Sequence, residues 1–145
     1  VATLGSLAAV PAIDAKEFAR QLTLNVSAPQ ALIAAFDPML RASEDARVVG
    51  ITTGVAAKPR AYWGAYGASK AALEVLIDAY GQEVRNISRI RTHIVEPGAT
   101  RTAMRARAYP GEDPATLKTP DVVGRAIADL VISDAADGAR ITLPK

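Results

Sequence analysis

The chain has 145 residues, half of them hydrophobic, and a formal net charge of +2 from 17 basic and 15 acidic residues, too small to suggest nucleic acid or a membrane surface as a partner. With no cysteine and one histidine, it has no disulfide, no thiol nucleophile and no metal site of the zinc type. No apolar run approaches the ~18 residues of a membrane span and no signal peptide is recognisable, so we expect a cytoplasmic protein.

Apolar runs typical of strands alternate with segments of helical periodicity, which is the pattern of a parallel α/β layer. Asp14 is a candidate N-cap with Glu17 as its capping-box partner, and it begins a helix expected to reach about Ala42. The sequence then predicts, in order, a strand over 46–53, a helix over 66–86, a strand over 90–95, a polar loop with a short helix within 103–118, a helix over 121–132 opened by Pro120, and a strand over 139–143. We expect residues 1–145 to form a single domain.

The most informative residues are Tyr66 and Lys70, which lie four positions apart in the third predicted element. Residues at this spacing share one face of a helix. A phenol with a pKa near 10 is a poor proton donor or acceptor at neutral pH, and an ammonium one turn away is expected to lower that pKa. The pair therefore predicts proton transfer to or from a carbonyl oxygen. The spacing alone is weak, because a half-buried aromatic and a solvated lysine would give it too.

Three further features lie where a site would need them. Thr53 closes the strand predicted over 46–53, thirteen residues before Tyr66, and a hydroxyl at the carboxyl end of a strand suits a site residue. The segment Pro97-Gly98-Ala99-Thr100-Arg101-Thr102 follows the next strand. Asn25 lies in the first predicted helix four residues before Pro29, which has no N–H to donate to the Asn25 carbonyl. Alone, Pro29 equally well marks a simple kink, and Thr53 a strand-ending residue.

Together, these features resemble the catalytic segment of the short-chain dehydrogenase/reductase family, and the resemblance covers essentially the whole chain. It implies an NAD(P)-dependent oxidoreductase that moves hydride between the nicotinamide of NAD or NADP and a small-molecule carbonyl or alcohol. The implied catalytic residues are Asn25, Thr53, Tyr66 and Lys70, with Tyr66 as the acid/base and Asn25 anchoring a relay water. The implied cofactor-binding residues are Tyr66, Lys70, Pro97, Gly98, Thr100 and Thr102.

The family begins with a glycine-rich cofactor-binding turn, and no such motif occurs in these 145 residues. We therefore expect the last strands and helices of a partial Rossmann-like, doubly wound parallel sheet, the carboxyl-terminal catalytic half of the fold. The resemblance also implies a homo-oligomer formed through the Asn25 and Tyr66 helices. The alternative is a truncated, inactive fragment that serves only as an assembly or interaction module.

Other side chains leave two interpretations open. The aromatic residues Tyr62, Trp63 and Tyr109 either line a substrate pocket or pack a loop. The loop arginines either meet an acidic substrate or a phosphopantetheine carrier, or are simply solvated; they are Arg101, Arg105 and Arg107. His93, within a predicted strand, is expected to be a hydrogen-bonded structural residue.

Overall fold

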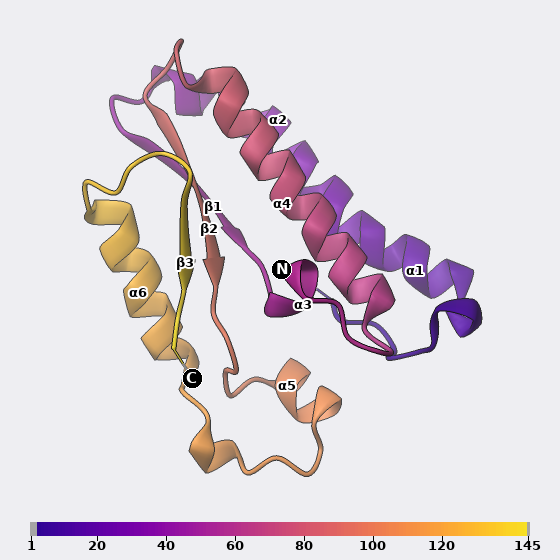
Figure 1. Ribbon diagram of the computed structural model, residues 1–145. Helices are drawn as coiled ribbons and strands as arrows, with labels where there is room; N and C mark the ends of the chain where they lie inside the picture. Colours follow the sequence, from indigo (N-terminus) through magenta and orange to yellow (C-terminus); the bar gives the residue numbers. More distant parts are fainter. Residues whose placement is uncertain (1–2, 145) are drawn as a thin grey trace.

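A three-stranded parallel sheet forms the centre of the computed structural model, which describes residues 3–144 (Figure 1). The strands β1 (Ala46–Ile51), β2 (Ile90–Glu96) and β3 (Ala139–Thr142) lie in the order β1-β2-β3. Ala46 lies opposite Ile90, and His93 lies opposite Ala139. The apolar, β-branched run of β2 is typical of a strand buried in a parallel sheet, whereas β3 alternates between partly buried and exposed residues. β1 and β3 are the two edges of this sheet.

Helices connect the strands. The element order begins with the 3-10 turn η1 (Val10–Ala12), α1 (Ala15–Leu22), the π-helical turn η2 (Thr23–Ser27) and α2 (Ala28–Ala42). Between β1 and β2 come α3 (Gly54–Ala57) and α4 (Gly64–Val84). Between β2 and β3 come α5 (Ala103–Ala108), the 3-10 turn η3 (Pro114–Thr116) and α6 (Pro120–Ile132). Among residues 3–144, no helix is long and apolar enough to cross a membrane.

The two long helices α2 and α4 cover one face of the sheet, and α6 lies on the opposite side (Figure 1). Alternate strand residues point to the two faces. One set packs beneath α2 and α4, where the core residues are Ala46, Leu73, Ile77, Tyr80, Val84, Ile90 and Ile94. The other set includes Arg47 and Arg91, which donate hydrogen bonds to the carbonyls of Ser133 and Ala135 just after α6.

Gly81 sets how closely α4 approaches β2. A Cβ atom at this position would collide with the hydroxyl oxygen of Thr92 on the strand. Hydrogen removes that obstacle, so the helix can lie directly against the sheet. Gly124, in α6, has no atom within 4 Å of the same added Cβ. Close packing of α4 on β2 therefore requires glycine at position 81, whereas packing does not require it at position 124.

The expected α/β architecture with a partial Rossmann-like parallel sheet is confirmed. Two details of the first helix differ from the prediction. It is interrupted by η2 rather than continuous, since Pro29 cannot complete an α-helical turn with residue 25. Asp14 caps α1 by accepting from the Glu17 N–H at 2.8 Å, but the Glu17 carboxylate accepts from Ser6 in place of closing a capping box.

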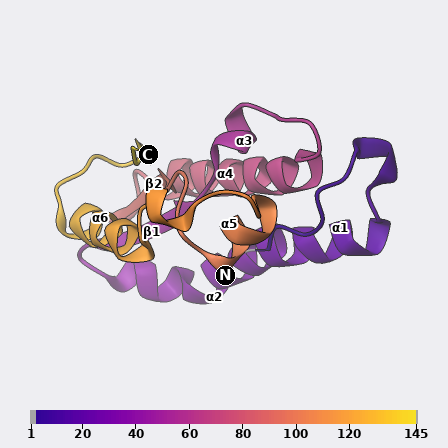
Figure 2. The same ribbon diagram turned by 90° about the horizontal axis from the view of Figure 1, so that it is seen from below.

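Loops from distant parts of the sequence meet at the carboxyl ends of the strands. Viewed from that end, α5 lies in front of the sheet, with the start of α4 and α3 beside it (Figure 2). The strand prediction over 46–53 ran two residues too far, because Thr52 and Thr53 leave β1 and lead into α3, an element that the sequence did not reveal. This end of the sheet carries the predicted site.

Candidate active site

Tyr66 and Lys70 lie one turn apart near the start of α4, and both are buried, with 8% and 3% of their surfaces exposed. The Lys70 ammonium donates a hydrogen bond to the carbonyl of Ile51, the last residue of β1, at 3.0 Å. Within residues 3–144, the Tyr66 hydroxyl has no hydrogen-bond partner. The phenol is therefore free to form a hydrogen bond with the oxygen atom of a ligand. Beside it, the ammonium of Lys70 is held in place by the last residue of β1.

The two adjacent threonines after β1 have different surroundings. The Thr52 hydroxyl donates to the Glu74 carboxylate on α4, so it is already engaged. Thr53 has an extended backbone with φ −157°, and its carbonyl accepts from the N–H of Ala56 as α3 begins. No partner for the Thr53 hydroxyl is found in the described part of the chain. This difference favours Thr53 over Thr52 as the site hydroxyl, as its spacing to Tyr66 predicts.

Asn25 lies in η2 and joins three parts of the structure. Its side-chain amide donates to the Thr3 carbonyl at 2.8 Å and to the Ser69 hydroxyl oxygen at 3.0 Å, while its carbonyl oxygen accepts from the Thr3 N–H at 2.9 Å. Ser69 belongs to α4, between Tyr66 and Lys70. The buried amide of Asn25 therefore ties the amino-terminal segment to the middle of the Tyr66 helix.

The loop after β2 turns sharply at Gly98, which has a φ of +65°. Such a value favours glycine, because side chains strain this conformation. Thr100 then pairs with Lys118 in an isolated parallel bridge, and Arg101 N–H donates to the Lys118 carbonyl at 2.9 Å. Thr102 caps α5 by accepting from the Arg105 N–H. Pro97, Gly98, Thr100 and Thr102 thus form one ordered loop at the carboxyl end of β2.

Burial shifts the pKa values of the central pair in opposite directions. It raises the pKa of the Tyr66 phenol above its ordinary value of 10.0 and lowers the pKa of the Lys70 ammonium below 10.5. The Tyr-Lys spacing predicts a lowered pKa for Tyr66, and that prediction is wrong for this structure, because loss of water around the phenol dominates. The phenol is protonated at neutral pH, as a free phenol is, and its raised pKa makes it a weaker acid in the absence of a bound partner.

Side chains from four segments enclose Tyr66. Leu4 and Val55 are buried against it, and Met104 and Ala108 of α5 pack onto the same cluster. Trp63 also joins, with its ring 6.1 Å from the Tyr66 ring in an edge-on arrangement. Tyr109 stacks on Trp63, whereas Tyr62 points away with 62% of its surface exposed. The sequence analysis named all three aromatic residues as a possible pocket lining or loop packing. In the structure, only Trp63 and Tyr109 contact each other.

Glu96 is a site residue that the sequence analysis did not single out. It ends β2, and a Cβ added to Gly54 would lie 2.6 Å from its carboxylate. Its other carboxylate oxygen accepts from the Thr142 hydroxyl at 3.5 Å. It thus spans the carboxyl ends of the three strands. The sequence feature that could have identified Glu96 is its position as an acidic residue at the end of an apolar strand, directly before Pro97-Gly98.

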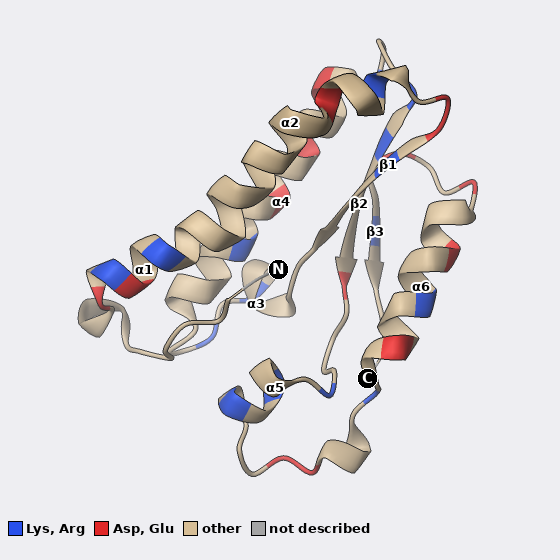
Figure 3. Cartoon of the chain, turned by 180° about the vertical axis from the view of Figure 1, so that it is seen from behind, with Lys and Arg blue, Asp and Glu red and all other residues tan. Residues whose placement is uncertain are grey.

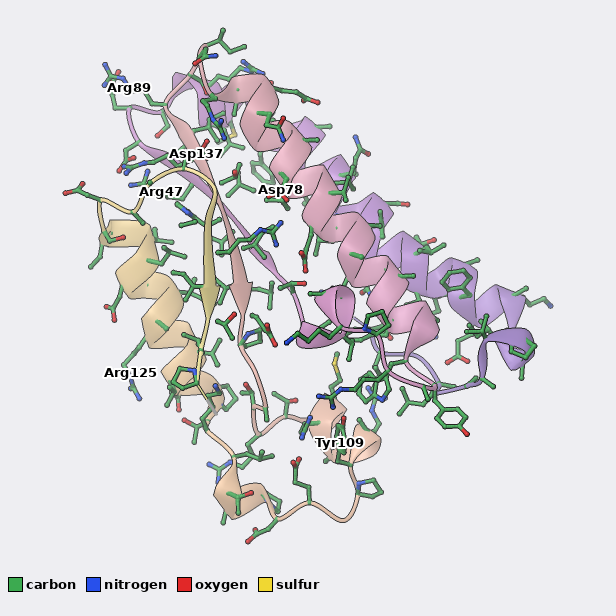
Figure 4. All side chains as sticks on the ribbon, viewed as in Figure 1. Arg47, Asp78, Arg89, Tyr109, Arg125 and Asp137 are labelled. Carbon is green, nitrogen blue, oxygen red and sulfur yellow. The ribbon has the colours of Figure 1, made fainter. Side chains whose placement is uncertain are left out.

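One surface hollow lies away from these residues. It has a volume of about 310 Å³ at the amino ends of the strands, where its charged walls pair with one another through contacts such as Arg85 with Asp137 at 3.2 Å. Figure 4 places Arg89 and Asp137 at that end and Tyr109 at the other. A smaller hollow of about 160 Å³ lies beside α5, lined by Thr102, Arg105, Tyr109 and other residues of this loop.

His93 differs from its prediction. It is buried in β2 with 1% of its surface exposed, but neither ring nitrogen has a hydrogen-bond partner within the described residues. It lies on the sheet face that carries Arg47, not beside Tyr66. Burial, followed in importance by the Arg47 charge, lowers its pKa below 6.5. It is a structural residue, as expected, but not a hydrogen-bonded one.

Comparisons with known proteins agree with this geometry. Residues 1–113 match the short chain dehydrogenase family. The oxidoreductase YciK of Escherichia coli K12 is 42% identical over 99 residues, which is 68% of this chain and 38% of YciK. The vibriobactin-specific 2,3-dihydro-2,3-dihydroxybenzoate dehydrogenase of Vibrio cholerae is 41% identical over 70 residues, 48% of this chain and 26% of that protein.

Solved structures give the same result. The structure of the oxidoreductase YciK from Escherichia coli superposes with a TM-score of 0.91 at 33% identity, covering 98% of this chain and 58% of that one. A short chain dehydrogenase from Shigella flexneri, complexed with NADP, gives 0.92 at 33% identity, covering 98% and 59%. The chain therefore spans less than two thirds of the relatives that it matches. It belongs to the short-chain dehydrogenase family.

Proposed function

We propose that this chain is the catalytic half of an NAD(P)-dependent oxidoreductase that moves hydride between a nicotinamide cofactor and a small carbonyl or alcohol substrate. One observation carries the proposal: the buried Tyr66 phenol has no hydrogen-bond partner among residues 3–144 and lies one helical turn from Lys70, at the carboxyl end of β1. A protonated phenol with a free hydroxyl is equipped to donate to the oxygen of a carbonyl as it is reduced.

The residues present fit the nicotinamide end of the cofactor. The Lys70 ammonium uses one of its three N–H groups on Ile51, which leaves two for ribose hydroxyls. Gly98, at φ +65°, makes the turn that the loop after β2 requires, and Pro97, Thr100 and Thr102 belong to that loop. When bound, NAD or NADP supplies or accepts the hydride. Relatives solved with NADP and NADPH support this class of cofactor.

Each residue of the site then has a defined role. Tyr66 donates the proton to the substrate oxygen, or removes it in the reverse direction, and the Thr53 hydroxyl donates a hydrogen bond to that oxygen. Lys70 holds ribose hydroxyls and stabilises the phenolate left after proton transfer. The Asn25 backbone carbonyl, to which Pro29 cannot donate, anchors a relay water towards Lys70. The absence of cysteine is consistent with the cytoplasm as the place of action.

The test compares the native protein with Tyr66→Phe, using loss of reduced-nicotinamide absorbance with NADH or NADPH and a panel of aldehydes, ketones and alcohols. We expect reduction to fall by about 10²–10⁴ in Tyr66→Phe, since only the proton is removed, while calorimetry shows unchanged cofactor affinity. If Tyr66→Phe keeps more than a few per cent of the native reduction rate, Tyr66 is not the proton donor. If neither NADH nor NADPH binds saturably and no turnover is seen, the result would favour the alternative, an inactive assembly module.

We also propose a homo-oligomer formed through α2 and α4. On α2, Leu32, Phe36 and Met39 share one face and are 58%, 49% and 68% exposed. Val75 on α4 is 67% exposed. Residues 28–36 of α2 carry no charge, which agrees with the tan stretch of this helix in Figure 3, and such an apolar face suits a second copy. Light scattering should give a dimer or tetramer that Phe36→Glu dissociates, whereas Gln30→Glu, on a different part of α2, should leave it assembled.

A further inference from the structure

A continuous series of side-chain contacts runs from the loop after α5 to the Tyr66 ring. Arg105 donates to both carboxylate oxygens of Glu112, through Nε and Nη2, each at 2.6 Å. Its guanidinium carbon lies 3.7 Å from the centre of the Tyr109 ring. Tyr109 stacks on Trp63 with ring centres 5.7 Å apart and planes at 27°, and Trp63 meets Tyr66 edge-on at 62°. Figure 4 places Tyr109 beside the α5 segment.

These contacts are needed to stabilise α5, because the helix is too short to be stable alone. Six residues are too few for a helix that is stable without tertiary contacts. Met104 and Ala108 attach one side of α5 to the Tyr66 cluster. The Arg105–Glu112 pair ties α5 to the loop that follows it and is only partly exposed, 26% for each side chain. A bidentate ion pair of this kind fixes both distance and direction, which a single surface contact does not.

Arg105 is also unavailable for another task. The carboxylate of Glu112 takes two of its nitrogen atoms, and the Tyr109 ring covers one face of its guanidinium group. An acidic substrate would have to displace both. Arg101 and Arg107 on the same segment have no ion pair within the part of the chain that the structure describes. The structure therefore separates Arg105 from the other two loop arginines.

We propose that Arg105 is a positioning residue for Tyr66. Its ion pair with Glu112 keeps Tyr109 stacked on Trp63, and Trp63 in turn fixes the orientation of the Tyr66 ring beneath α5. The hydroxyl of a tyrosine lies in the plane of its ring, so the ring's orientation decides where the proton points. This inference rests on the proposed function for its catalytic meaning, but the arrangement itself can be tested without any turnover.

Trp63 provides that test, because it is the only tryptophan in the sequence. In Arg105→Ala, we expect its fluorescence emission to shift to longer wavelength and its quenching by acrylamide to rise. Arg107→Ala is the matched control, since it removes the same charge from an exposed position on the same helix. Glu112→Gln, which keeps the size of the side chain, should behave as Arg105→Ala does. Circular dichroism establishes that each variant is folded.

Exchange of the two charges gives a stricter test. Arg105→Glu alone places two carboxylates together and should release α5, while the double variant Arg105→Glu, Glu112→Arg should recover much of the native Trp63 emission. An emission spectrum in Arg105→Ala identical to that of Arg107→Ala, or no recovery in the double variant, would overturn the proposal. A role in overall folding alone would be seen in circular dichroism and would not be reversed by the exchange.

Kinetics link the arrangement to the reaction. With NADPH and para-nitrobenzaldehyde as the probe, Arg105→Ala should lower kcat about tenfold and leave the affinity for NADPH unchanged, because a misplaced proton donor slows the chemical step. If Tyr66→Phe leaves the rate intact but Trp63 still responds to Arg105→Ala, the proposed function fails and the positioning contact remains. If Tyr66→Phe abolishes the rate and Arg105→Ala changes neither fluorescence nor kcat, only the present inference fails.

Discussion

The side chain of Asn25 pairs with the backbone of Thr3 through two hydrogen bonds, 2.8 and 2.9 Å long, one in each direction. An amide that both donates to and accepts from one residue imitates the pairing of a neighbouring strand. A third bond, to the Ser69 hydroxyl oxygen at 3.0 Å, connects the same amide to α4. Asn25 is thus a stabilising contact between segments, in addition to the relay role proposed for its carbonyl.

Asn25→Ala should therefore destabilise the fold even without cofactor. It leaves the Thr3 N–H without its partner and removes three hydrogen bonds at a site that is 1% exposed, so we expect a loss of about 2–4 kcal/mol in the free energy of unfolding. Urea denaturation measures it. Thr23→Ala is the control, since the exposed Thr23 hydroxyl bonds only within its own helix and should cost less than about 0.5 kcal/mol. Equal effects of the two variants would contradict this account.

Lys70→Met is expected to separate stability from cofactor binding. Lys70 is 3% exposed, and burial of its charge is costly, while the bond of its ammonium to the Ile51 carbonyl offsets part of that cost. Methionine removes both effects with a side chain of similar length, so the free energy of unfolding should change by less than about 1.5 kcal/mol. Cofactor affinity, measured by calorimetry, should fall at least about tenfold because ribose contacts are lost. An unchanged affinity would remove Lys70 from the binding site.

The sequence predicted this fold from the spacing of apolar residues, which is a local property. It could not predict α3, because the four residues Gly54–Ala57 carry no periodic signal and form a helix only where Val55 is buried against Tyr66. The raised pKa of Tyr66 was missed for a related reason. Lys70 is visible four residues away in sequence, whereas Leu4, Met104 and Ala108, which help to exclude water from the phenol, come from distant segments.

Two helical glycines should respond oppositely to the same substitution. Gly124→Ala adds a methyl group to open space in α6 and should raise the free energy of unfolding by about 0.5–1 kcal/mol, the usual helix preference of alanine. Gly81→Ala gains the same preference but forces α4 away from Thr92, and should lower it by about 1–3 kcal/mol. Thermal denaturation of both variants measures the difference. Stabilisation by Gly81→Ala would mean that α4 and β2 are less closely packed than the structure shows.

His93 should make stability depend on pH. Burial, Arg47 and Arg91 lower its pKa below 6.5, against an opposing effect of Asp137, so the unfolded chain binds a proton at pH values where the folded chain does not. Stability from this residue is therefore complete above about pH 6.5 and declines as the pH falls through that value towards the lower folded pKa. In His93→Met, the melting temperature should lose this dependence between about pH 6.5 and 5, above the range in which carboxylates titrate. The same slope in both proteins would exclude His93 as its cause.

The π-helical turn at Thr23–Ser27 acts as a change of phase between two helices. A π turn holds about one residue more than an α turn, so every residue of α2 is rotated by about 100° from its place in an uninterrupted α-helix. Ile33 and Leu40 pack towards the sheet only with that rotation in place. Deletion of one residue within 23–27 would let α1 and α2 continue as one regular α-helix with both side chains still in phase, whereas straightening the turn at its present length would rotate them away from β1. In this segment, the number of residues therefore decides which type of helix keeps α2 in place.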